Sequence, residues 1–159
     1  MANKITFEVA DGQVQKGLQR LYEATGNIKP ALNVVGRKIL ARVKLGFPSH
    51  RSPYGEQWQP LKSRKGEPLR DTGRLLASLT YSVGGSGDSQ FVDVGTNVKY
   101  APIHQYGAII GRASKAGPSR IVIPARPYLP IKNDDVTLPE AWAADALTAL
   151  YKHFQKATR

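Results

Sequence analysis

The sequence predicts an α+β fold in which a small, mostly antiparallel sheet packs with N-terminal helices and a long C-terminal helix. Apolar residues recur with helical spacing near both ends of the chain, they alternate with polar residues in short segments between, and glycine-rich turns separate those segments. With 159 residues, 41% of them hydrophobic, the chain can enclose one core, so we expect a single domain over residues 1–159.

The N-terminal part of the chain predicts one strand and two helices. Polar and apolar residues alternate over residues 4–9, which is the period of a strand. Asp11 is a suitable N-cap for a helix that ends at Gly26. A second helix is expected to begin at Lys29–Pro30 and to end at Gly46–Pro48. Its predicted apolar arc consists of Leu32, Val35, Ile39, Leu40 and Val43.

Two segments predict long flexible loops. Residues 48–70 hold four prolines and show no periodicity, and residues 107–118 are rich in glycine, alanine and serine. A loop as long as the first is usually functional inside a compact domain. We expect Trp58 and Leu61 to pin part of it to the body.

Short elements are expected between the two loops. Asp71 or Thr72 is the predicted cap of a short helix that runs to Leu79. Two strands, Thr80–Val83 and Gln90–Val94, are separated by a glycine-rich hairpin turn. Residues 100–106 fit either one helical turn or an irregular segment.

The C-terminal part predicts a strand, an extended segment and a helix. Ile121–Ile123 reads as a short strand, and three prolines make Pro124–Pro130 stiff and extended. Thr137–Glu140 has the pattern of a capping box that starts the last helix. Apolar residues recur there every four positions: Leu138, Trp142, Ala146, Leu150 and Phe154.

The sequence holds no recognisable active-site pattern. It has no cysteine and three histidines, which excludes disulfides, thiolate zinc sites and cysteine nucleophiles. It has no phosphate-binding loop, nucleophile elbow or zinc-protease motif. We therefore expect no catalytic residue, no cofactor and no metal.

Two chemical alternatives are weaker than the structural roles of the same residues. His104, between Tyr100 and Tyr106, is the candidate general base, and Asp71 with Asp93 is the candidate carboxylate pair of a metal-dependent hydrolase. Structural hydrogen bonding fits His104 better, helix capping fits Asp71, and the exposed side of a strand fits Asp93.

The net charge of +11, from 23 Lys and Arg against 12 Asp and Glu, bears on association and does not identify a partner. The alternative function is nucleic-acid binding by the 48–70 loop, where Tyr54 and Trp58 stand among basic residues. The candidate DNA-facing residues are Arg51, Lys62, Arg64, Lys65 and Arg70. A solvated loop, or one ordered by a partner subunit, is favoured because no nucleic-acid motif is present.

No segment approaches the ~20 apolar residues that span a bilayer. The N-terminus lacks the apolar run of a signal peptide. We expect a soluble protein made in the cytoplasm, without membrane contact.

Four stretches, in order along the chain, resemble the phage virion morphogenesis family in its Mu protein G-like group, which is related to tail-completion and head–tail joining proteins. They are Ser52–Leu61, Leu69–Leu79, Val94–Gly107 and Ile123–Leu129. The resemblance implies a structural protein of a tailed phage or prophage, located in the virion at the head–tail neck or tail terminus. It implies that the protein has no enzymatic activity, assembles in an oligomeric ring and binds other neck or tail proteins. The nucleic-acid hypothesis overlaps with this one, because a neck ring encircles passing DNA and the basic loop could contact it nonspecifically.

The stiff Pro124–Pro130 segment is the predicted subunit or partner interface, because its prolines lower the entropic cost of docking. The predicted interface residues are Arg126, Pro127, Tyr128, Leu129, Trp58 and Tyr106. The alternative is that such residues complete the core of the monomer. A closed ring needs two different patches, for which the Arg126–Leu129 segment and the apolar arc of the second helix are candidates. Alanine at Arg126 is expected to weaken assembly and leave the monomer folded.

Overall fold

The computed structural model describes residues 12, 16–17, 19, 26–62, 65–114, 117–133 and 135–157. The predicted strand at residues 4–9 and most of the helix predicted from Asp11 lie outside the described residues. The elements are α2 (Lys29–Ser49), α3 (Arg74–Ser78), β1 (Thr80–Gly84), a 3-10 turn (Gly87–Ser89), β2 (Phe91–Gly95), α4 (Ala101–Tyr106), β3 (Ala108–Ser114), β4 (Gly117–Ile123), β5 (Ile131–Lys132), β6 (Asp135–Val136) and α5 (Glu140–Ala157). The predicted α+β class with antiparallel pairing is confirmed, and the described strands form three separate two-stranded sheets.

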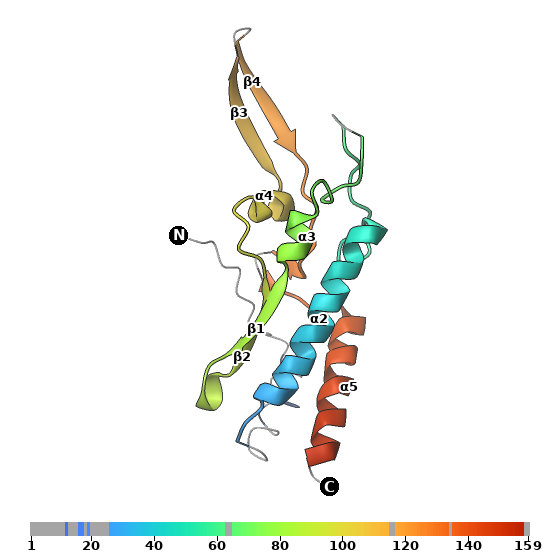
Figure 1. Ribbon diagram of the computed structural model, residues 1–159, viewed down its shortest axis with the longest axis vertical. Helices are drawn as coiled ribbons and strands as arrows, with labels where there is room; N and C mark the ends of the chain where they lie inside the picture. Colours follow the sequence, from blue (N-terminus) through green and yellow to red (C-terminus); the bar gives the residue numbers. More distant parts are fainter. Residues whose placement is uncertain are drawn as a thin grey trace.

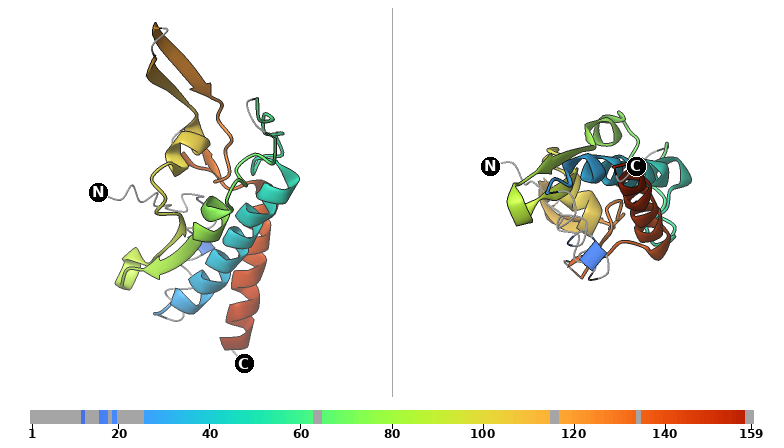
Figure 2. Two further views of the ribbon diagram at one scale, coloured as in Figure 1. Left: turned by 45° about the horizontal axis from the view of Figure 1, so that its top comes forward. Right: turned by 90° about the horizontal axis from the view of Figure 1, so that it is seen from below.

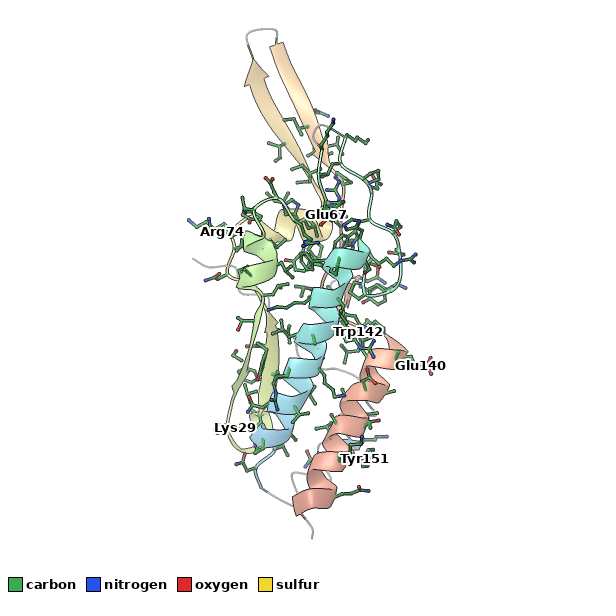
Figure 3. All side chains as sticks on the ribbon, turned by 45° about the vertical axis from the view of Figure 1, so that its right-hand side comes forward. Lys29, Glu67, Arg74, Glu140, Trp142 and Tyr151 are labelled. Carbon is green, nitrogen blue, oxygen red and sulfur yellow. The ribbon has the colours of Figure 1, made fainter. Side chains whose placement is uncertain are left out.

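The two long helices, α2 and α5, lie side by side and run in opposite directions (Figure 1). Figure 3 shows this through Lys29 at the start of α2, which lies at the same end of the pair as Tyr151 near the end of α5. The Nε atom of Arg42 donates to Oδ2 of Asp145 at 3.1 Å and so joins the helices at their surface. This hydrogen bond holds the pKa of Asp145 below its ordinary value. Four residues of the predicted arc of α2 are buried: Leu32, Val35, Ile39 and Val43.

The hairpin of β1 and β2 packs across α2 at Gly36. A Cβ atom on Gly36 would lie 2.5 Å from the Tyr81 ring and 2.8 Å from the Val92 side chain. Tyr81 pairs with Val94, and Val83 pairs with Val92, so the hairpin presents neighbouring apolar side chains to the helix. The missing side chain of Gly36 is what allows helix and hairpin to approach this closely.

The segment predicted as a second flexible loop, residues 107–118, forms most of a hairpin instead. Strands β3 and β4 pair from Ala108–Ile123 to Ser114–Gly117. We call residues 108–123 the arm, because this hairpin projects away from the rest of the molecule (Figures 1 and 2). The loop prediction is wrong because it weighed the small residues near the tip. The β-branched residues at the base favour strands: Ile109, Ile110, Ile121 and Val122.

The predicted start of the C-terminal helix is wrong. Helix α5 begins at Glu140, and the N–H groups of Trp142 and Ala143 both donate to the carbonyl of Pro139. Glu140 is therefore in the first position of the helix, too early to close a capping box with Thr137.

Helix α3 begins later than predicted, at Arg74. Gly73 precedes it with a φ of 73°, and no side chain caps the helix from that position. The hydroxyl of Thr72 accepts the Arg74 N–H at 3.3 Å from one residue further back, and Asp71 lies outside the cap position. Residues 101–106 form α4, so the helical alternative for this segment is the one observed.

The loop after α2 lacks long helices and strands, as predicted, and several bonds tie it to the body. Trp58 is buried, and its backbone N–H donates to the His50 carbonyl at 2.8 Å. The Ser52 hydroxyl accepts the N–H groups of Tyr54 and Glu56. The hydroxyl of Tyr54 donates to the Thr137 carbonyl at 2.9 Å. The buried Trp58 side chain and these hydrogen bonds thus fix the part of the loop before residue 63.

Replacing Gly36 by valine should destabilise the fold. The added methyl groups would meet Tyr81 and Val92 inside a packed interface, and overpacking of this kind costs about 1–3 kcal/mol. Urea unfolding measures the change. The control is Arg37→Val, which places the same side chain on an exposed position of α2 and should change stability by about 0.5 kcal/mol or less. Equal effects of the two variants would contradict the close approach at Gly36.

Candidate functional site

The extended segment 124–130 lies next to α4, where Gln105 binds its backbone. Gln105 is 2% exposed. Its Oε1 atom accepts the N–H groups of Tyr128 and Leu129, each at 3.0 Å, and its Nε2 donates to the Leu129 carbonyl at 3.2 Å. One side chain therefore satisfies three backbone groups of a buried segment that belongs to no strand.

Arg126 and Trp58 bind the same segment to the loop after α2. Arg126 is 5% exposed, and its Nε and Nη2 atoms donate to the carbonyls of Gln59 at 2.8 Å and Pro60 at 3.2 Å. The indole N–H of Trp58 donates to the Pro127 carbonyl at 2.8 Å. The segment is thereby held on two sides, by α4 and by the loop.

Four of the six predicted interface residues are buried in the isolated chain: Arg126, Tyr128, Leu129 and Trp58. Phe47 of α2 packs against Trp58 with ring centroids 5.6 Å apart and against Tyr128 at 5.8 Å. Their burial favours the alternative role, completion of the monomer core, and a part in an interface stays a prediction for these four. Tyr106, which is 52% exposed, and the half-buried Pro127 retain surface for a neighbour.

The apolar arc of α2 is covered by the β1–β2 hairpin and α5, so it offers no second patch for a ring. The sequence located the arc correctly but could not tell which surface buries it. Helical periodicity marks a face that must be covered, and the chain itself covers this one.

The predicted basic residues of the 48–70 loop have different surroundings. Arg51 donates to the Gly55 carbonyl at 3.0 Å, and Arg70 pairs with Glu67 at 2.6 Å. Lys62 and Lys65 are exposed, and Arg64 lies outside the described residues. Nucleic-acid binding by this loop stays a prediction.

A groove with a volume of about 910 Å³ lies between α3, α4, the base of the arm and the loop after residue 60. Figure 3 shows Arg74 and Glu67 at this end of the body, below the arm. Two candidate catalytic residues, His104 and Asp71, line the groove together with Arg74 and Arg126. No pattern in the sequence indicates that these four residues share one surface.

The described surroundings of His104 do not orient it as a base. Its Nδ1 atom is buried without a hydrogen-bond partner among the described residues, and the Tyr100 ring packs edge-on at 5.6 Å. Burial, and then the Arg126 guanidinium, lower the pKa of His104. A neutral imidazole at this position fits a structural role.

Asp93 lies on β2 and is buried, which contradicts its expected place on an exposed side of a strand. Val92, Asp93 and Val94 are all buried, so β2 is covered on both faces. Asp93 does not line the groove that holds Asp71, and the predicted carboxylate pair is not assembled there.

Among the residues that the structure describes, no cluster of three or more His, Cys, Asp or Glu could hold a metal ion. Within the same part of the chain, no helix is long and apolar enough to cross a bilayer.

The apolar surface of the arm was not predicted from the sequence. Ile109 and Val122, which face each other across the hairpin, are 69% and 67% exposed. Ile110 and Ile121 form the next exposed pair, on the opposite face of the hairpin. Exposed apolar side chains on a projecting element are typical of an interaction surface. Two β-branched pairs at equal distances from residues 115–116 are the sequence signal of this hairpin.

Two comparisons place the chain among known proteins. Residues 9–147 match the phage virion morphogenesis family. The chain belongs to this family. A relative from Haemophilus influenzae, the Mu-like prophage FluMu G protein 2, is 33% identical over 152 residues, which are 95% of this chain and 96% of the relative. No solved structure matches the chain significantly. The resemblance stated from the sequence is confirmed, and the chain has a role in phage virion morphogenesis.

Arg126→Ala should destabilise the monomer, contrary to the expectation from the sequence. The carbonyls of Gln59 and Pro60 lose a charged donor, and such hydrogen bonds contribute about 1.5–3 kcal/mol each. We expect a loss of about 2–4 kcal/mol in urea unfolding. Arg120→Ala, at an exposed arginine of the arm, is the matched control and should unfold like the wild type. A fully stable Arg126→Ala variant would show that the buried guanidinium does not hold the loop.

His104 should make stability depend on pH. Its pKa is lower in the folded chain than the ordinary value of 6.5, so the unfolded chain binds the proton first as pH falls. The free energy of unfolding therefore decreases as pH falls below about 6.5. Urea unfolding at about pH 7.5 and about pH 5.5 should show a larger loss for the wild type than for His104→Gln. Equal losses in the two proteins would assign the pH dependence to other groups.

Proposed function

We propose that the protein is an assembly protein of the head–tail neck or the tail terminus, where copies form a ring that joins neighbouring virion proteins. The observation that carries this proposal is the arm. It projects from the body and carries four exposed β-branched residues at its base (Figure 2). A soluble monomer gains nothing from such a surface, whereas an assembly protein buries it against a neighbour.

The mechanism is binding, without a bond made or broken. The body is held by its own core, and the arm offers a surface that the core does not use. Because the arm is already paired as a hairpin, docking orders few additional residues. The partners are other neck or tail proteins, and the protein acts in the virion.

Ring formation requires head-to-tail contacts between two different patches of the body. Tyr106 and Pro127 remain from the predicted interface, and both have surface left to contribute to one patch. The family membership and the Mu-like prophage relative support a place in the virion. Contact of the basic loop with DNA that passes through such a ring is part of the same proposal.

The test is complementation of a phage or prophage that lacks the gene. Without the protein, electron microscopy should show heads and tails that form separately and do not join. Wild-type protein should restore joined particles, and the double variant Ile109→Ser, Val122→Ser should not. Loss of two central apolar anchors weakens binding by about 2 kcal/mol or more, which is about thirty-fold.

The control is Tyr151→Ser, which removes an equally exposed large side chain from α5. This variant should restore joining, and both variants should keep the wild-type melting temperature. Particles that join normally without the protein would overturn the proposed function.

A further inference from the structure

The arm is a two-stranded sheet whose outer edges are paired with no further strand in the described part of the chain. An isolated two-stranded hairpin is marginally stable in water. Exposed strand edges present free N–H and C=O groups that pair readily with another chain. The arm is therefore incomplete as a sheet, and the question is which of its two edges is open.

The register decides which backbone groups point outward. Only residues 115 and 116 separate Ser114 from Gly117, so this pair is the hydrogen-bonded pair that closes the hairpin. In an antiparallel ladder, hydrogen-bonded and non-hydrogen-bonded pairs alternate. The non-hydrogen-bonded pairs, whose backbone groups face the outer edges, are Ala113–Pro118, Gly111–Arg120 and Ile109–Val122.

The two edges differ in their ability to accept a strand. On β4, one of the three outward positions is Pro118, which has no N–H to donate, and a second is the charged Arg120. Proline and charge are the devices that block edge pairing. On β3, the outward positions are Ile109, Gly111 and Ala113, which keep all three N–H groups. The edge of β3 is open, and the edge of β4 is blocked.

Charge selects the kind of strand that can occupy this edge. The arm contains Arg112, Lys115 and Arg120 and no acidic residue. A second arm of the same chain would bring like charges together, which disfavours pairing. An extended segment with acidic and apolar side chains complements both the charges and the exposed Ile109 and Val122.

We propose that the edge of β3 accepts an acidic, apolar β-strand from a different virion protein, so that the arm becomes part of a sheet shared between two proteins. This inference rests on the proposed assembly function and specifies how the arm binds. Main-chain hydrogen bonds to Ile109, Gly111 and Ala113 give the affinity, and the side chains of the arm select the partner.

Hydrogen exchange of the full-length protein tests the proposal, with intact virions compared with the free chain. The outward amides of Ile109, Gly111 and Ala113 should exchange at least about tenfold more slowly in virions. The outward amides of Arg120 and Val122 on β4 should keep their rates. Unchanged rates on β3, or protection on β4 instead, would overturn the inference. Protection of β3 in the purified protein alone would also overturn it, because the occupant would then be a second copy.

Matched variants test the same edge in the complementation assay. Gly111→Pro removes one outward N–H of β3, whereas Gly111→Ala keeps it and adds a Cβ atom into open space. The proline variant should reduce joined particles at least about tenfold, and the alanine variant should assemble like the wild type. Arg120→Pro, at the opposite position on β4, should assemble like Arg120→Ala.

Two results separate this inference from the proposed function. If the protein is required for joining but Gly111→Pro assembles as well as Gly111→Ala, the strand-addition inference fails and the function stands. If Arg120→Pro is as damaging as Gly111→Pro, the general shape of the arm matters and the inference about the β3 edge also fails. Joining without the protein removes the proposed function itself.

Discussion

The pairing of Gln105 with the backbone of residues 128 and 129 is the interaction on which the rest of the structure depends. A segment with three prolines cannot form a complete strand ladder, so its buried N–H and C=O groups need partners elsewhere. Gln105 carries an acceptor and a donor on one planar amide and satisfies three such groups. Each buried group left unsatisfied costs about 1–3 kcal/mol. The burial of Tyr128 and Leu129 against Phe47 is therefore possible because this amide is present.

The same interaction closes the base of the arm. Gln105 stands just before β3, and the backbone that it binds stands just after β4, so both ends of the hairpin are fixed to one point. The N–H of Arg126 adds a bond to the His104 carbonyl at 2.7 Å. Gly107, with a φ of 77°, lets the chain pass so close that a Cβ atom would lie 2.9 Å from the Ile123 carbonyl oxygen. The direction of the arm is thus set by the core.

Local patterns predicted α2, the β1–β2 hairpin and the apolar face of α5, because periodicity and turn residues lie within each segment. They failed for Arg126 and Gln105, whose partners are backbone groups far along the chain. The carbonyls that Arg126 binds are 67 and 66 residues away along the chain. The neighbouring prolines in the sequence therefore do not indicate that this arginine is buried. The arm was mistaken for a loop because its tip is rich in small residues. Backbone pairing between strands requires no large side chains, so small residues do not exclude a hairpin. The groove shared by Asp71 and His104 could not be predicted from local sequence patterns either, because tertiary packing brings the two residues to one surface.

The stretches that carry the family resemblance stop at Gly107 and resume at Ile123, the last residue of the arm, so they frame the arm and leave out residues 108–122. They contain the residues that lock its base: Gln105, Gly107, Arg126 and Tyr128. The core therefore depends on residues outside the arm, and side chains on the arm can change with little effect on the stability of the body. A locked base also means that a partner binding the arm orders only the arm itself, which keeps the entropic cost of docking low. The body thus provides a fixed mount, and the arm provides the exposed surface on which the proposed contact depends.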